Sequence, residues 1–216
     1  MKITRFPQSC FLIEAGSKRI LIDPGHLNLE DSFFDLWKDI DAVLITHKHG
    51  DHCDPKIIEK VSPKEIYSSQ EVANAYSEMK IEIVKEGDTI VLDEVSISVV
   101  HAQHGYIPLL KDGKEIFENI GYIIEVGGKK LYHTSDSISF HNDYKCDIIL
   151  VPVCNHGLVM GPFEAAEFAK ETGATLVIPM HYDNPTFPAD MDKVKEEFEK
   201  HELKYQILAI KESVEV

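Results

Sequence analysis

Arginine is almost missing from this chain, and the charge of the remaining residues is strongly negative. Only Arg5 and Arg19 carry a guanidinium group among 216 residues, and the formal net charge is −15. Proteins that bind nucleic acid need basic stripes on their surface, and an acidic surface repels polyanions. We therefore expect no nucleic-acid partner. A small anionic substrate stays compatible with this composition, because a bound metal ion supplies local positive charge.

Long hydrophobic runs are missing too. No apolar stretch approaches the roughly 20 residues that a membrane-spanning helix needs. The N-terminal segment does not combine the basic, apolar and small-residue regions of a secretory signal. These absences predict a cytoplasmic protein that has a small-molecule substrate and no membrane partner. A homo-oligomer is compatible with the sequence, which contains no feature that fixes the oligomeric state.

The four cysteines form no Cys-x-x-Cys pair, which is a common spacing in structural zinc and redox sites. Unpatterned cysteines in a cytosolic chain are most often buried thiols, and we expect this for all four. Cys53 directly follows a histidine of the motif described below. Ligation of a soft metal or local oxidation is therefore an alternative for Cys53, although a helix-start residue that points into the core is the preferred interpretation.

Linker composition is missing as well, because no low-complexity segment and no segment rich in proline, glycine and serine divides the sequence. A chain of 216 residues can build one sizeable core, so we predict one domain over residues 1–216. A faint internal repeat runs through it. Residues 11–21 align with residues 122–132, and each stretch has two strand-like runs around a glycine-centred turn, which is typical of a hairpin.

A second repeated unit follows each hairpin. Residues 41–45 align with residues 147–151, and each apolar run leads into a loop and then a helix that begins near Pro55 or Pro162. Strand pairs followed by strand–loop–helix units predict an α/β protein with mixed β-sheets. Outside the repeat, we also predict a helix over residues 70–80 and a closing strand over residues 205–210.

The most informative segment is residues 46–52, Thr-His-Lys-His-Gly-Asp-His. It places four potential metal ligands, His47, His49, Asp51 and His52, between a predicted buried strand and a predicted helix start. A rigid scaffold presents functional groups from such loops. Imidazole and carboxylate groups together suit zinc and other first-row divalent metals. A polar surface loop without a metal is the alternative, but such a loop rarely collects ligands this densely.

This His-x-His-x-Asp-His pattern resembles that of the metallo-β-lactamase superfamily, and the resemblance covers nearly the whole chain. Three downstream residues match the later ligand motifs of that superfamily in order, namely His104, Asp136 and His181. Asp23 matches its early structural aspartate. The resemblance implies a four-layered αββα sandwich of two mixed β-sheets with outer helices. Within the superfamily, the chain is most similar to small metal-dependent hydrolases related to L-ascorbate-6-phosphate lactonase.

The same resemblance implies a centre with two divalent metal ions. The implied ligands are His47, His49 and His104 for the first ion, Asp51, His52 and His181 for the second, and Asp136 between them. Two neighbouring cations lower the pKa of a water molecule, give a metal-bound hydroxide at neutral pH and polarise the bond to be cleaved. Asp51 is predicted to be catalytic as well as a ligand. Zinc is the favoured metal, with manganese or iron as alternatives, because these ligand types accept all three.

Three other histidines have competing interpretations. His101 competes with His104 for the first ion, but the family spacing favours His104 and leaves His101 as a strand-end residue that supports a ligand. His133 is expected to pack against the neighbouring hairpin. Alignment of the two repeats places His156 opposite the metal loop, so that His156 is either a catalytic proton donor or anion-binding group near the substrate, or a structural loop residue.

We therefore expect a metal-dependent hydrolase that cleaves a small lactone or another ester, as the lactonase-like resemblance implies. Phosphodiester hydrolysis of a small substrate is the alternative, because the same metal pair serves it. A non-catalytic metal-binding or redox protein is the alternative of a different class. Closed structural zinc sites use four ligands and favour cysteine, whereas seven ligands from separate regions of the chain suit an open catalytic site.

Overall fold

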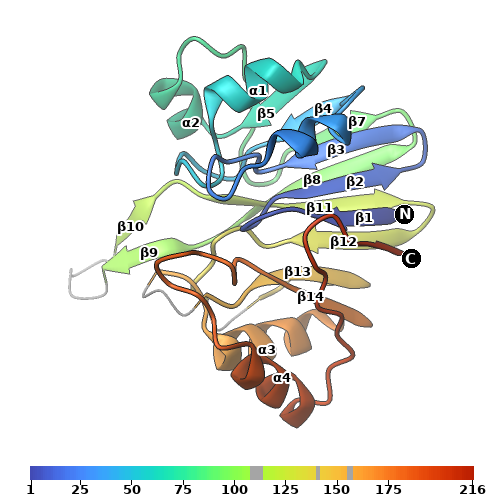
Figure 1. The fold of residues 1–216 in the computed structure, drawn as a ribbon, viewed down its shortest axis with the longest axis vertical. Helices are drawn as coiled ribbons and strands as arrows, with labels where there is room; N and C mark the ends of the chain where they lie inside the picture. Colours follow the sequence, from blue (N-terminus) through green and yellow to red (C-terminus); the bar gives the residue numbers. More distant parts are fainter. Residues whose placement is uncertain (108–113, 140–141, 155–157) are drawn as a thin grey trace.

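Two β-sheets packed face to face form the centre of the protein, and helices cover the outer side of each sheet (Figure 1). The computed structural model describes residues 1–107, 114–139, 142–154 and 158–216. Within these residues the first sheet has seven strands, the second has six, and a separate two-stranded ribbon extends from one end. The predicted four-layered αββα sandwich is confirmed.

The strands of the first sheet are, in spatial order, β15 (Ser213–Glu215), β1 (Lys2–Arg5), β2 (Phe11–Ala15), β3 (Lys18–Ile22), β4 (Ala42–Leu44), β5 (Glu65–Ser68) and β6 (Glu82–Ile83). Those of the second sheet are β14 (Leu176–Met180), β13 (Ile148–Pro152), β12 (Lys129–His133), β11 (Ile120–Val126), β8 (Val95–His101) and β7 (Thr89–Leu92). The ribbon consists of β9 (His104–Ile107) and β10 (Lys114–Phe117).

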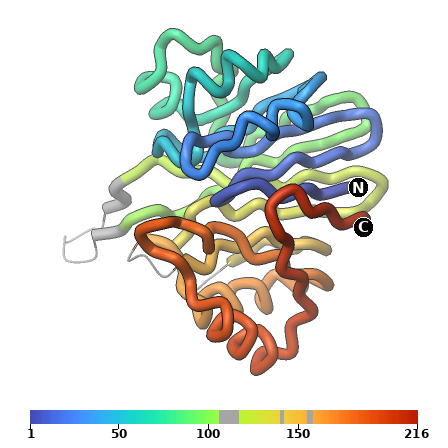
Figure 2. Tube along the Cα trace, in the orientation of Figure 1, coloured from blue at the N-terminus to red at the C-terminus, as the bar shows by residue number. Residues whose placement is uncertain are grey.

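The helices divide between the two outer faces (Figures 1 and 2). The first sheet is covered by the 3-10 helix η1 (Asp31–Asp35) and by α1 (Pro55–Val61) and α2 (Gln70–Ala75). The second sheet is covered by α3 (Pro162–Thr172) and α4 (Met191–Lys200). No helix among the described residues is long and apolar enough to cross a membrane.

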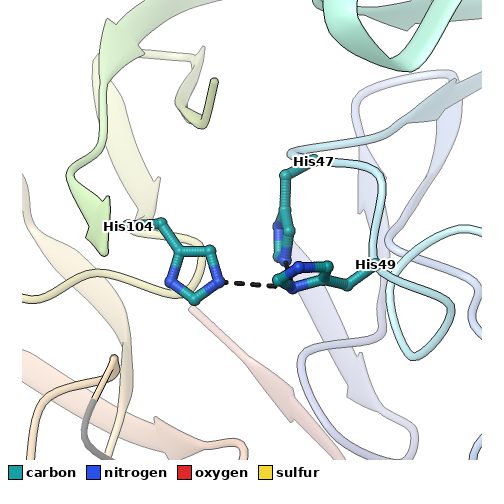
Figure 3. Close-up of side chains that lie close together, drawn as sticks. All are labelled: His47, His49 and His104. Atoms are coloured by element: carbon teal, nitrogen blue, oxygen red, sulfur yellow. Dashed lines mark hydrogen bonds between the residues drawn. The ribbon is translucent and has the colours of Figure 1, made fainter. Parts of the chain in front are cut away.

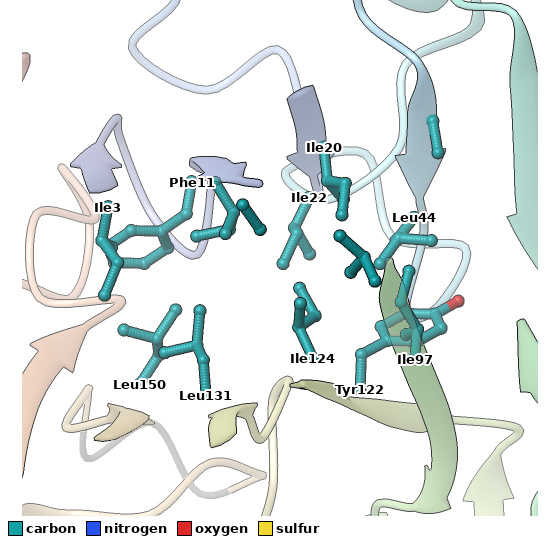
Figure 4. Packing of buried hydrophobic residues seen from close by; sticks show 14 of the residues in the cluster. Ile3, Phe11, Ile20, Ile22, Leu44, Ile97, Tyr122, Ile124, Leu131 and Leu150 are labelled. Carbon is teal, nitrogen blue, oxygen red and sulfur yellow. The ribbon is translucent and has the colours of Figure 1, made fainter. Parts of the chain in front are cut away.

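The main core lies between the sheets, and the period of two along each strand explains why it forms there (Figure 4). In β3, Ile20 and Ile22 point between the sheets while Leu21 points toward the helices of the first sheet. In β13, Leu150 points between the sheets and Ile149 points toward the helices of the second sheet. Because successive side chains alternate across a strand, apolar residues at both positions bury a sheet on both faces.

The predicted repeat is confirmed at the level of single hydrogen bonds. Asp41, just before β4, accepts a 2.8 Å hydrogen bond at its carboxylate from Arg19 N, and its own N–H donates to Arg19 O. Asp147, just before β13, makes the same two bonds with Lys130. Each hairpin is thus joined to the following parallel strand in the same register. Ile20 of β3 lies opposite Ala42 of β4, and Leu131 of β12 lies opposite Ile148 of β13.

The predicted helix over residues 70–80 is wrong beyond Ala75, where α2 ends. Tyr76 leaves the helical conformation, with a φ of −128°. Its hydroxyl donates a 2.9 Å hydrogen bond to Lys48 O in the loop after β4. The long-range anchor therefore competes with the local helix-forming tendency, and it attaches α2 to the histidine-rich loop.

The predicted closing strand over residues 205–210 is also wrong, because this segment makes only an isolated bridge, between Tyr205 and Val177. The chain then turns so that Leu208 is buried and its carbonyl accepts hydrogen bonds from Arg5 Nη1 and the Tyr182 hydroxyl, at 3.4 and 2.5 Å. The closing strand is instead β15, which pairs with β1.

Candidate metal centre

The histidine-rich loop runs from the end of β4 to the start of α1, as the sequence predicts. Asp54 caps α1 by accepting hydrogen bonds from Lys56 N and Ile57 N, and Pro55 occupies the first helical turn. The loop also packs closely on the segment after β3, because a Cβ at Gly25 would lie 2.0 Å from backbone atoms of Asp51. The loop is therefore fixed at both ends and along one side.

A first cluster of nitrogen atoms is formed by His47, His49 and His104, whose potential ligand atoms all lie within 4.8 Å of one another. Figure 3 shows the three rings converging from the loop and from the start of β9. His49 Nδ1 lies 3.0 Å from His47 Nε2 and 3.3 Å from His104 Nε2. The resulting triangle of ring nitrogens is the donor set that a zinc-type ion takes in an open catalytic site.

Hydrogen bonds to the remote ring nitrogens orient two of these imidazoles. His104 Nδ1 lies 3.0 Å from Leu158 O, to which it donates, so Nε2 carries the free lone pair. His47 Nδ1 lies 3.1 Å from the Thr46 hydroxyl, which in turn donates to Asp23. Burial is the main reason why the pKa values of both histidines fall below their usual value. Both rings are thus neutral and available as ligands.

A second cluster lies beside the first and combines imidazoles with carboxylates. Asp51, His52 and His181 form one group of potential ligand atoms within 4.8 Å, and His47, His52 and Asp136 form another. His181 Nε2 lies 3.3 Å from Asp51 Oδ2 and 3.2 Å from Asp136 Oδ2. His52 Nε2 lies 3.3 Å from Asp136 Oδ2. The carboxylate of Asp136 therefore contacts histidines from both halves of the repeat.

Asp23 orients the second cluster through hydrogen bonds to Thr46 and His52. Its buried carboxylate accepts hydrogen bonds from Thr46 N and the Thr46 hydroxyl, both 2.8 Å long, and from His52 Nδ1 at 2.7 Å. The bond from Nδ1 leaves His52 Nε2 facing the cluster. This is the orienting role that a buried aspartate plays behind a ligand histidine.

Charges in the second cluster balance one another. Burial opposes ionisation of His52 and His181, but Asp136 and the other carboxylates outweigh it and raise the pKa of both histidines well above their usual value. Burial likewise raises the pKa of Asp51, yet the neighbouring His52 and His181 lower it to about 2. The carboxylates of this cluster thus favour a positive charge on the atoms that face them.

The donor set fits divalent cations on these grounds. The first cluster offers neutral nitrogens, and the second offers two ionised carboxylates whose charge a cation would compensate in place of the protons. His52 Nε2 is buried and makes no hydrogen bond to any residue that the structure describes. Its nearest carboxylate oxygen, Asp136 Oδ2, lies 3.3 Å away, and a bound cation would be held between these two groups.

Comparison with known proteins identifies the family. A family model described as a beta-lactamase superfamily domain matches residues 2–181. A metal-dependent hydrolase from Pyrococcus abyssi is 35% identical over an alignment that covers 90% of this chain and 91% of that protein. The chain belongs to the metallo-β-lactamase superfamily. Its enzyme class, metal-dependent hydrolase, agrees with the class predicted from the histidine-rich loop.

Solved structures show the same superfamily fold. A metallo hydrolase from Ignicoccus hospitalis superposes with a TM-score of 0.79 at 24% identity, covering 99% of this chain and 97% of that one. A metallo-beta-lactamase fold protein from Bacillus subtilis superposes with a TM-score of 0.74 at 18% identity, covering 99% and 98%. At these identities the likeness concerns the fold, which is the metallo-β-lactamase sandwich.

The structure separates the competing histidines of this superfamily member. His104 lies in the first cluster, whereas His101 lies at the exposed end of β8 and belongs to no group of potential ligands in the described chain. His133 packs edge-on against Phe11 of β2, 6.1 Å between ring centroids, so its predicted contact with the neighbouring hairpin is confirmed. His156 lies outside the described residues, and its role stays a prediction.

Cys53 is buried with a free thiol in the core under α1, as are the other three cysteines in their own surroundings. Burial is the main cause that raises the pKa of the Cys53 thiol above its usual value. The preferred interpretation of Cys53 as a core residue of this metallo-β-lactamase superfamily protein is therefore confirmed by its position.

Several residues that support the centre carry no signal in the sequence. Asn119 donates a 2.9 Å hydrogen bond to the backbone carbonyl of Asp136, and the Ser9 hydroxyl lies 3.5 Å from Asp136 Oδ1. The Phe117 ring packs against His49 and His104, with ring centroids 4.5 and 5.1 Å apart. These contacts join segments far apart in the chain, so no local spacing announces them. They place polar and aromatic side chains directly beside the two clusters.

Proposed function

We propose that this protein hydrolyses a small lactone or another ester with two divalent metal ions, zinc by preference and manganese or iron as alternatives. One observation carries the two-metal proposal. The group of His47, His52 and Asp136 links the three-histidine cluster to the cluster of Asp51, His52 and His181. Two adjacent donor sets with a carboxylate between them are the arrangement that a pair of cations requires.

Each residue has a proposed task. His47, His49 and His104 would hold the first ion, Asp51, His52 and His181 the second, and Asp136 would contact both. When bound, the ions would polarise the scissile carbonyl and lower the pKa of a water molecule. The Asp51 side chain is partly exposed to solvent, and its carboxylate with a pKa of about 2 stays ionised at neutral pH. It is therefore suited to ligation and to orienting the attacking water as a hydrogen-bond acceptor, more than to removing a proton.

The surroundings of the first cluster support a lactone or ester over a phosphodiester. Phe117 gives an apolar wall beside His49 and His104. The nearby ammonium group of Lys48 is already paired with Glu71, 2.7 Å away. With a net charge of −15 on the chain, little positive charge besides the metal ions is left for a phosphodiester. We propose a small-molecule substrate and a cytoplasmic location, without a nucleic-acid partner.

Metal analysis tests the number and identity of the ions. Purified protein analysed by inductively coupled plasma mass spectrometry is expected to contain two divalent ions per chain, because the clusters offer two donor sets. Removal of the ions with a chelator should abolish hydrolysis, and zinc should restore it. A metal-free sample that is folded and fully active would refute the proposal.

A substrate panel tests the bond. Initial rates on small lactones, aryl esters, phosphodiesters and thioesters are expected to give the highest kcat/KM for a lactone or ester. Turnover confined to phosphodiesters would replace the proposed substrate class by the alternative and leave the metal proposal intact.

Substitution of two neighbouring histidines tests the first donor set. His104→Ala is expected to release roughly one of the two ions, because the three-nitrogen cluster loses a member. His101→Ala should keep both ions, since its ring lies outside the clusters. Metal content and far-UV circular dichroism of both variants provide the measurement. Metal loss in His101→Ala alone would mean that the wrong histidine is assigned.

A further inference from the structure

His181 differs from the other buried histidines of the centre in how its ring is held. His47, His52 and His104 each have a hydrogen-bond partner at the ring nitrogen that faces away from the cluster. His181 Nδ1 is buried and makes no hydrogen bond with a described residue. Ligand histidines usually depend on such a bond for their orientation. The orientation of the His181 imidazole therefore depends on the contacts of its Nε2 with Asp51 and Asp136 and on the backbone at its own position.

The backbone at His181 is held in an uncommon conformation by its neighbours. His181 follows β14 directly and has a φ of 56°, in the left-handed region that side chains other than glycine rarely adopt. Its N–H donates a 3.0 Å hydrogen bond to Gln8 O. Gln8 N in turn donates a 2.9 Å hydrogen bond to Asp183 Oδ1, and Gln8 Nε2 donates to the same oxygen. Residues 181–183 are thereby fastened to the loop between β1 and β2.

A buried arginine completes this attachment. Arg5 ends β1, is 1% exposed, and places Nη2 2.8 Å from Asp183 Oδ2. Its guanidinium lies 4.0 Å above the centre of the Tyr182 ring, and the Tyr182 hydroxyl is bound to Leu208 O. A planar guanidinium can stack on a ring and face a carboxylate at once, which an ammonium group cannot do in the same way. Arg5 therefore contacts both residues that follow His181.

We propose that Arg5 and Asp183 are positioning residues for the second metal ion, because their buried ion pair fixes the left-handed turn at His181 and so aims its Nε2 at Asp51 and Asp136. This inference rests on the proposed two-metal function. Asp183 makes two contacts in this arrangement. Its Oδ1 accepts a hydrogen bond from Gln8 N, and its Oδ2 faces the guanidinium of Arg5. Removal of the charge at Asp183 leaves a buried guanidinium without its counter-ion and frees the turn.

Titration of metal-free protein with zinc tests this role. Asp183→Asn keeps the size of the side chain and removes its charge. We expect the variant to bind the second zinc ion about 10–100-fold more weakly than the wild type, with the first ion's affinity within about twofold, since an outer partner of a metal ligand has an effect of this order. Arg5→Lys keeps the positive charge but removes the planar stacking group, so an intermediate loss is expected. Isothermal titration with a competing chelator resolves the two steps.

A control and a second measurement keep the outcomes separate. Asp147→Asn changes a carboxylate that accepts a backbone N–H at the far end of β13, and it should leave both affinities unchanged. In metal-free protein, amide hydrogen exchange at His181 should be faster in Asp183→Asn than in the wild type. Unchanged zinc affinities, or equal weakening of both steps, would overturn the positioning role. If the wild type binds fewer than two ions but Asp183→Asn still shows the faster exchange, the two-metal function is rejected and the attachment of His181 is retained.

Discussion

Asp136→Ala is expected to abolish hydrolysis and to lower the occupancy of both metal positions. The carboxylate is 4% exposed and lies 3.2–3.3 Å from the facing nitrogens of His181 and His52. Its loss removes a donor from the place where the two clusters meet and leaves two histidines without their main counter-ion. We expect zinc affinity to fall by more than the roughly 10–100-fold that outer partners contribute. Metal content after dialysis and turnover on the best substrate measure this.

The matched control is Asp147→Ala, which removes a carboxylate at the opposite end of β13 from the centre. This variant should retain both ions and wild-type turnover, even if it is somewhat less stable. Wild-type rates and two bound ions in Asp136→Ala would remove Asp136 from the metal centre.

Asp23→Ala is expected to destabilise even the metal-free protein. The fully buried carboxylate is the shared acceptor of Thr46 N, the Thr46 hydroxyl and His52 Nδ1. Removing one member of a buried charged pair costs about 3–5 kcal/mol, because the remaining groups stay buried without partners. Urea denaturation in the presence of a chelator measures the free energy of unfolding without a contribution from metal binding.

Thr46→Val provides a graded comparison for Asp23. It removes the hydroxyl that donates to the carboxylate and that also contacts His47 Nδ1, so the expected loss is about 1–3 kcal/mol. Equal stability of wild-type and Asp23→Ala protein under these conditions would show that Asp23 serves the metal-loaded state alone. A loss in Thr46→Val as large as that in Asp23→Ala would assign the effect to the hydroxyl.

Parts of the molecule with a local signature were predictable from the sequence. The loop between β4 and α1 has its ligands, its capping Asp54 and Pro55 within one short stretch, and the structure has the helix start at that place. The hairpin repeat was visible because apolar residues at a period of two flank a glycine turn in both copies. Those patterns were sufficient to predict an α/β protein with mixed β-sheets, and the resemblance to the metallo-β-lactamase superfamily implied the four-layered arrangement with outer helices.

Parts that depend on distant contacts were not predictable. The end of α2 is determined by the bond from the Tyr76 hydroxyl to Lys48 O. Residues 205–210 do not form the predicted strand, because Leu208 O instead accepts hydrogen bonds from Arg5 and Tyr182. The contacts of Gln8 with Asp183 and of Ser9 with Asp136 join residues more than a hundred positions apart. A single sequence has no spacing rule for such pairs, because the fold alone brings them together.

The left-handed conformation at His181 is one of several around the centre, and it bears on where the protein could be stabilised. Gln8, Asp23, Ser135 and His181 all have a positive φ of 50–60° and all border the centre. Each such residue costs about 1–2 kcal/mol relative to an ordinary conformation, and glycine would relieve it. Glycine at Gln8 or Ser135 would relieve this cost but would also remove the bond from Gln8 Nε2 to Asp183 or the bond from the Ser135 hydroxyl to Asn119. The strained side chains are thus held by the contacts that they make around the centre. Engineering for stability therefore belongs at the far ends of the strands, away from this edge.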